Sequence, residues 1–125
     1  MRKILAAVFI MAFVSGCAGS AGMQSKTETA AIDALVAPGK IHEACYEMLK
    51  GQVLRYRFTA SKPLDFNIHF HEGAHISYPV ELNGVAAQNG DYVIPQDQFY
   101  CLMWTNKQAE PVTLGGSVVL LRSPQ

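Results

Sequence analysis

A strict alternation of apolar and polar side chains constrains the fold of this chain more than any other feature of its sequence. From position 64 to 71 the even-numbered residues are apolar and the odd-numbered residues are polar. Residues 76–82 repeat the pattern, with Ser77, Pro79 and Glu81 at the odd positions. Successive side chains of a β-strand point to opposite faces of a sheet, so this period of two predicts two strands, each with one buried face.

Three further segments have the composition of strands, at residues 53–58, 98–105 and 112–121. Residues 98–105 are apolar on both faces, which is typical of a central, covered strand. Gly, Pro and Asn residues mark turns at short intervals between the segments, and helical periodicity is possible only over residues 42–49. Many short strands at this spacing predict an all-β domain, an antiparallel β-sandwich of the jelly-roll or a related type.

The N-terminus has the three parts of an export signal. Two cations precede the apolar run of residues 4–14, which is too short to remain as a membrane-spanning helix of about 20 residues. The sequence Val14-Ser15-Gly16-Cys17 then resembles the lipobox of bacterial lipoproteins. We therefore predict that residues 1–16 are removed as a signal peptide and that Cys17 is lipidated. The alternative is an ordinary cleaved signal followed by a chance cysteine.

A lipidated Cys17 implies a location in the bacterial cell envelope. Two acyl chains or more give lasting attachment to a membrane. Ala18 stands where an Asp would resemble an inner-membrane retention signal, which favours the outer membrane with the domain facing the periplasm. Residues 17–29 are rich in Gly, Ser, Ala and Thr and predict a flexible tether, and residues 30–125 then form one domain.

The charge of the mature chain argues against a nucleic-acid partner. The chain has ten Lys and Arg and ten Asp and Glu, and loss of Arg2 and Lys3 with the signal leaves eight cations against ten anions. A nucleic-acid-binding domain normally presents a basic patch, which this sequence lacks. The expected partners are the membrane, through the lipid anchor, and a protein or small ligand.

Cysteine usage supports export. Lipidation of Cys17 leaves Cys45 and Cys101, and an even remainder in an oxidising compartment predicts a disulfide between them. The alternative is a pair of reduced, buried thiols.

The later part of the chain resembles the GOLD domain, the lumenal β-sandwich of Golgi cargo receptors and of related bacterial exported domains. The resemblance covers roughly residues 40–121. The segments that carry it are Cys45, Gly51–Tyr56, Leu64–Ile68, Gly90–Pro95, Tyr100–Cys101 and Trp104–Asn106. It implies a sandwich with a disulfide and a binding role instead of catalysis. The chain departs from the cargo receptors in lacking their transmembrane helix and cytoplasmic tail, so the resemblance does not justify carrying over their trafficking role.

Three of the four histidines, His69, His71 and His75, lie within seven residues. If the two alternating strands form a hairpin, directly opposed residues must share a face. Because both strands have their polar residues at odd positions, opposed residues must then be both odd or both even. A three-residue loop of residues 72–74 satisfies this rule. His71 would then lie opposite His75, and His69 opposite Ser77, so that three imidazoles converge on one exposed face. Imidazole is a common ligand for Cu and Zn, which makes this face a candidate metal site. The alternatives are solvated polar positions without a ligand, or a face that docks a partner protein.

The sequence favours a non-catalytic function. It contains no nucleophile elbow, phosphate-binding loop or zinc-protease motif. We predict a lipid-anchored binding module of the envelope, for a protein or a small ligand. A metal-binding lipoprotein that uses the histidine cluster, and a purely structural envelope protein, are the alternatives.

Overall fold

The computed structural model describes Gly16, Gly19 and residues 25–122. The remainder of the predicted signal peptide, Cys17 and most of the predicted tether lie outside the described residues. The described part contains six strands, β1 (Lys26–Val36), β2 (Ile41–Met48), β3 (Val53–Glu72), β4 (His75–Val93), β5 (Gln98–Thr105) and β6 (Val112–Arg122). Among these residues, no helix is long and apolar enough to cross a membrane.

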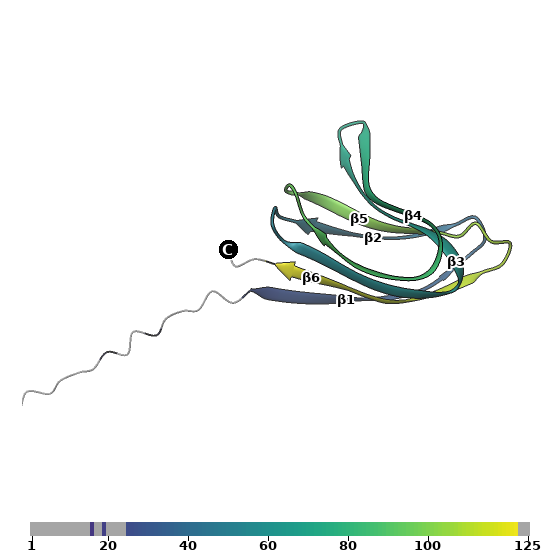
Figure 1. Ribbon diagram of the computed structural model, residues 1–125, viewed down its shortest axis with the longest axis horizontal. Coiled ribbons are helices and arrows are strands. Elements are labelled where there is room, and N and C mark those ends of the chain that lie inside the picture. The colour runs from purple at the N-terminus through teal and green to yellow at the C-terminus, as the bar shows by residue number, and fades with distance from the viewer. Residues whose placement is uncertain (1–15, 17–18, 20–24, 123–125) are drawn as a thin grey trace, which may run out of the picture.

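All strand pairs are antiparallel, which confirms the predicted all-β fold class. The strands form one curled sheet in the order β1-β6-β3-β5-β2, with β4 paired to β3. The sheet folds over on itself into two layers, with β1 and β6 in one and β2 and β5 in the other (Figure 1). The two layers are therefore halves of one continuous sheet, whose shape is compatible with a sandwich.

The layers are joined by the two longest strands. The first half of β3, Val53–Ala60, pairs with β6, and its second half, Asp65–His69, pairs with β5. Strand β4 follows β3 through both layers, and the pairing shifts register between Thr59 and Leu64 and again between Leu64 and Phe66. The chain bends at these shifts, because an irregularity in the ladder locally changes the direction of a strand.

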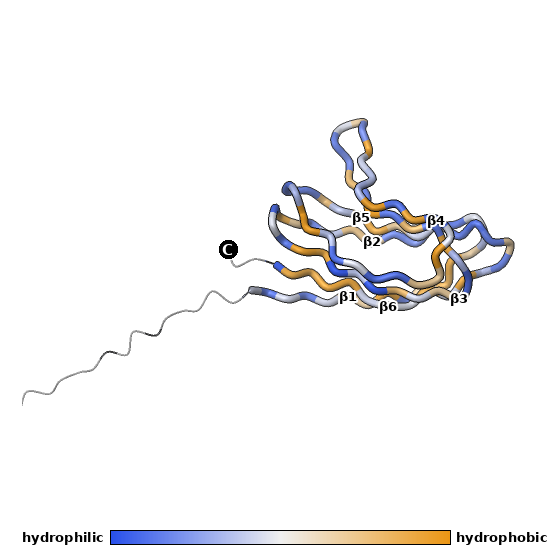
Figure 2. Tube along the Cα trace, viewed as in Figure 1, coloured by the Kyte–Doolittle hydropathy of each residue, from blue (hydrophilic) through white to orange (hydrophobic). Residues whose placement is uncertain are grey.

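The core lies between the layers. Apolar positions alternate with polar ones along the strands of both layers (Figure 2). The indole of Trp104 is fully buried and packs against the rings of Phe58 and Phe66, with ring centroids 5.6 and 5.3 Å away. Phe58 and Phe66 come from the two halves of β3, so Trp104 holds the folded strand closed. Tyr100 is buried as well, whereas Phe99 is 58% exposed, although residues 98–105 are predicted to form a strand that is covered on both faces.

Several boundaries differ from the sequence-based prediction. Strand β1 begins at Lys26, four residues before the predicted domain boundary, so the end of the predicted tether is paired with β6. Residues 42–49, where helical periodicity was possible, lie almost entirely in strand β2. The predicted three-residue loop at 72–74 is wrong. Glu72 pairs with His75 across a two-residue turn, in which Gly73 adopts a φ of 60°.

A buried asparagine ties two connections together. Asn106 is fully buried, and its side-chain amide donates hydrogen bonds to the carbonyl oxygens of Val36 and Glu110. Its side-chain oxygen accepts from the backbone N–H of Gln108. The β1–β2 turn and the β5–β6 loop are thus held by one side chain whose polar groups are all paired.

The bend of β3 and β4 carries an ion pair. Asp65 pairs with Lys107 and accepts a hydrogen bond of 2.9 Å from the backbone N–H of Gly84, a residue with a φ of 65°. The Lys107 ammonium, helped by this N–H, lowers the pKa of Asp65 against the opposing effect of partial burial. The charged form of Asp65 therefore stabilises the folded state.

We predict that Asp65→Asn lowers the free energy of unfolding by roughly 1–2 kcal/mol at pH 7. The depressed pKa of Asp65 provides stability that is fully present above the ordinary carboxyl value of 3.8 and is lost as pH falls through the folded value. Urea unfolding of the wild type and the variant should therefore differ at neutral pH and converge in acid. Asp33→Asn is the matched control, because Asp33 is exposed and makes no ion pair among the described residues. An Asp65→Asn variant as stable as the wild type at pH 7 would contradict the assignment.

Candidate functional site

One outer surface of the sheet brings together the residues with the richest chemistry. The strand register places Met103 of β5 between Glu43 of β2 and Asn67 of β3, and Cys101 between Cys45 and His69. These are odd-numbered positions, which point away from the core in this half of the sheet. We call this surface the disulfide face. Its members are Glu43, Cys45, Asn67, His69, His71, Phe99, Cys101 and Met103.

The disulfide joins β2 and β5 at the centre of this face. Cys45 lies directly opposite Cys101, and the two sulfurs are bonded, as predicted. The two halves of the bond differ in access, because Cys45 is exposed whereas Cys101 is 7% exposed. A thiol from solution therefore reaches the sulfur of Cys45 more readily than that of Cys101.

His69 points to the outer side of the sheet and is nevertheless buried. Only 6% of its side chain is exposed, so the prediction that every odd position in this strand faces water is wrong here. The rings of His71 and Tyr78 cover it, with centroids 5.4 and 5.6 Å away. Tyr78 reaches this position because β4 has an extra residue opposite His69, between the pairs Ile68–Val80 and Phe70–Ser77.

Each ring nitrogen of His69 faces a side-chain oxygen. Its Nδ1 lies 2.8 Å from Oδ1 of Asn67 and donates a hydrogen bond to this oxygen. The lone pair of the neutral ring is then on Nε2, which lies 3.8 Å from Oε1 of Glu43. Burial lowers the pKa of His69, an effect that Glu43 opposes and His71 reinforces. The ring is therefore neutral at pH 7, and its contact with Glu43 is not an ion pair.

Glu43 completes a group of three potential metal ligands. One ligand atom each from Glu43, His69 and Cys101 lies within 4.8 Å of the others. Carboxylate, imidazole and thiolate are the three ligand types that bind Zn²⁺ in proteins. No local pattern in the sequence marks Glu43 as a ligand, because its position depends on the pairing of β2 with β5 and of β5 with β3.

The predicted cluster of His69, His71 and His75 is assembled only in part. His69 and His71 are neighbours, and their rings meet edge to face. Ile76, instead of His75, stands opposite His71. Since adjacent residues of a strand point to opposite sides, His75 lies on the other side of the hairpin from His71. The structure thus places both His71 and Glu43 next to His69, and His75 apart from them.

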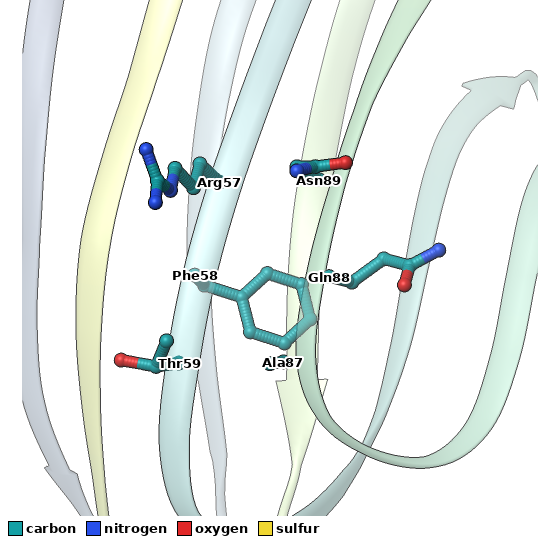
Figure 3. Close-up of a pocket in the computed structure, with 6 residues that line it drawn as sticks. All are labelled: Arg57, Phe58, Thr59, Ala87, Gln88 and Asn89. Carbon is teal, nitrogen blue, oxygen red and sulfur yellow. The ribbon is translucent and has the colours of Figure 1, made fainter.

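A second concave region lies on the other half of the sheet, between β3 and β4. It is a hollow of about 280 Å³, lined by Arg57, Phe58, Thr59, Ala87, Gln88 and Asn89. Figure 3 shows the guanidinium of Arg57 pointing away from Asn89, so the polar groups of the hollow do not converge. Arg57 is its one charged residue, and the hollow offers no acid–base pair. The disulfide face is therefore the stronger candidate site.

Comparison with known proteins finds fold resemblance without a family. No protein-family model and no curated protein sequence matches the chain. Among solved structures, PliG of Aeromonas hydrophila, a periplasmic inhibitor of g-type lysozyme, is 13% identical over 78% of this chain and 86% of its own, with a TM-score of 0.47. A de novo designed double-stranded β-helix is 13% identical over 79% of this chain and 100% of its own, with a TM-score of 0.36.

A family two carbohydrate esterase from Cellvibrio japonicus is 12% identical over 78% of this chain, with a TM-score of 0.36. The match spans 35% of the esterase, so most of that enzyme has no counterpart here. Similarity at this level assigns neither a family nor a function to this chain, and the resemblance to the GOLD domain stays a prediction.

The cover over His69 can be tested by removing it. We expect Tyr78→Ala to admit water to the imidazole and to raise the pKa of His69 toward the ordinary value of about 6.5. An NMR titration of the imidazole protons measures this change directly. Ile76→Ala removes an exposed apolar side chain from the same strand and should leave the pKa of His69 as in the wild type. An unchanged pKa in Tyr78→Ala would show that Tyr78 does not control the hydration of His69.

Proposed function

We propose that this chain is a lipid-anchored, non-catalytic binding domain of the bacterial envelope. We further propose that its ligand is a divalent metal ion, Cu(II) or Zn(II), held by His69 and Glu43. The observation that carries the proposal is the state of His69, a buried neutral imidazole whose Nδ1 is fixed by Asn67 and whose Nε2 faces a carboxylate.

The arrangement of His69 is the one that a metal ligand requires. A ligating histidine normally donates its other N–H to an oxygen, which fixes the tautomer and the orientation of the ring. Asn67 supplies that oxygen at 2.8 Å. Because burial keeps His69 neutral, a metal ion does not have to displace a proton from Nε2 at pH 7.

The spacing of the two ligands also fits an ion. Two donor atoms that each lie about 2.1 Å from a tetrahedral metal ion are roughly 3.4 Å apart. The observed separation of 3.8 Å between Nε2 of His69 and Oε1 of Glu43 needs only a small inward movement. Glu43 has 35% of its side chain exposed and can make this movement. The exposed His71 ring lies next to His69 but outside the group formed by the ligand atoms of Glu43, His69 and Cys101, so the proposal uses His69 and Glu43 alone.

The metal proposal predicts one site per chain in a titration with Cu(II) or Zn(II). The measurement is calorimetry on the full-length protein in detergent, under oxidising conditions. His69→Gln and Glu43→Gln should each weaken binding by about tenfold or more, the equivalent of about 1.4 kcal/mol. His75→Gln is the matched control and should bind as the wild type does.

Two results would contradict the metal proposal. One is the absence of binding at micromolar metal, which would leave the face to a protein or a small organic ligand. The other is a site that survives His69→Gln and disappears in His75→Gln, which would place the metal on the hairpin tip.

The envelope location predicts that the anchor depends on a single cysteine. In cells, Cys17→Ser should abolish the incorporation of labelled palmitate, because the variant has no thiol to receive the lipid, and should release the protein from the membrane fraction. Ser20→Ala, three residues further on, should change neither property. A Cys17→Ser protein that is still labelled and still sediments with membranes would refute the lipid anchor while leaving the metal site untouched.

A further inference from the structure

We propose that the Cys45–Cys101 disulfide is a redox gate of this metal site. Its reduction releases Cys101 as a thiolate ligand beside His69 and Glu43, so that the reduced protein binds a soft divalent metal more tightly than the oxidised one. The inference rests on the proposed function, because it uses the same imidazole and carboxylate and adds a third, sulfur ligand.

The geometry around Cys101 supports a sulfur ligand. The ligand atoms of Cys101, His69 and Glu43 already lie within 4.8 Å of one another, although they come from three different strands. Two of the three residues, His69 and Cys101, are buried, so little water has to be displaced from them. In the oxidised protein the sulfur of Cys101 is bonded to Cys45 and carries no charge, whereas metal ions bind the thiolate.

The difference in access between the two cysteines sets the course of reduction. A thiolate of an external dithiol attacks the exposed sulfur of Cys45, forms a mixed disulfide with it, and expels Cys101 as a thiolate. The second thiol of the reductant then resolves the mixed disulfide. In sum, the protein disulfide and one dithiol give two protein thiols and one oxidised reductant. The Cys45 sulfur also lies near Glu43, at 3.2 Å from its Oε1, but the sulfur that leaves, that of Cys101, is the one grouped with both His69 and Glu43.

Metal binding completes the reaction without further redox chemistry. A Zn(II) ion, which has no redox chemistry of its own, replaces the proton of the Cys101 thiol, and this proton passes to solvent. The metal keeps its oxidation state, and the side chains of Glu43 and His69 supply the two other ligands. Such a set of one sulfur, one nitrogen and one oxygen ligand leaves an open position on a tetrahedral ion. The reductant class is a dithiol protein of the thioredoxin type, since disulfides otherwise persist in the envelope.

Cobalt(II) tests the inference because thiolate ligation gives it a near-ultraviolet charge-transfer band that oxygen and nitrogen ligands do not give. The key variant is Cys45→Ser, which leaves Cys101 as a free thiol without any reductant. The matched control is Cys101→Ser, which leaves a free thiol at the opposed position, Cys45. Both are measured as full-length proteins in detergent, beside the oxidised wild type.

We expect the Cys45→Ser protein to show the charge-transfer band and to bind Co(II) at least about tenfold more tightly than the oxidised wild type. The band should be absent from Cys101→Ser and should be lost when His69→Gln is added to Cys45→Ser. Equal Co(II) affinity and no band in Cys45→Ser would overturn the inference. A band of equal strength in Cys101→Ser would overturn it as well, because it would show binding by any exposed thiol.

The two proposals fail in different ways. If the oxidised wild type binds metal through His69 and reduction changes nothing, the redox gate is wrong and the proposed function stands. If the oxidised wild type binds no metal and Cys45→Ser does, the site is a thiolate site and the proposed oxidised function is wrong.

A second measurement covers the case in which Cys45→Ser does not fold. The wild type is reduced with a phosphine, which is then removed, and its thermal unfolding is followed with and without Zn(II). A ligand that binds only the folded state raises the midpoint of unfolding. A larger rise for the reduced than for the oxidised protein supports the gate, and an equal or smaller rise overturns it.

Discussion

The structure depends on one strand, β3, which runs through both layers of the sheet. Its first half pairs with β6 and its second half with β5, so the covalent chain itself connects the two halves of the sheet. Phe58 and Phe66, one from each half, therefore meet the same indole of Trp104. The candidate site is tied to this packed connection, because His69 lies on the second half of β3, three residues beyond Phe66. A ligand on such a strand is more firmly placed than one on a loop.

The burial of His69 arises from an irregularity in the neighbouring strand. If β3 and β4 paired without a bulge, His69 would lie on an open outer surface. Two residues of β4, Tyr78 and Pro79, instead occupy the space opposite His69, and the ring of Tyr78 lies over the imidazole. Pro79 has no N–H to donate to the ladder, so a bulge is a position where it costs little. The irregularity thus converts a solvated polar position into a neutral, oriented and shielded one.

The alternation of residues 64–82 predicts the two strands and, for most positions, the face of each side chain. It does not predict the turn. Directly opposed residues are both even-numbered where Phe66 pairs with Leu82 and Ile68 with Val80. At the two-residue turn an even residue, Glu72, pairs with an odd one, His75, and the extra residue of the bulge in β4 removes this mismatch. A two-residue turn and a one-residue bulge shift the register in opposite directions and leave no trace in a pattern of period two, so the pattern alone predicts His75, instead of Ile76, opposite His71. The place of Glu43 in the site cannot be predicted from a local pattern, because its position near His69 depends on pairings between strands that are distant in the sequence.

The chemistry of the disulfide face explains why sulfur and metal should respond to each other. A thiolate at Cys101 would place a second negative charge next to Glu43, in a partly buried site where the neutral ring of His69 offers no compensation. Like charges at this distance disfavour each other, so the thiolate is costly until a cation binds between them. By linkage, any factor by which reduction tightens metal binding is also the factor by which the metal favours reduction. If the proposed coupling is tenfold, it corresponds to about 30 mV in the potential of the disulfide.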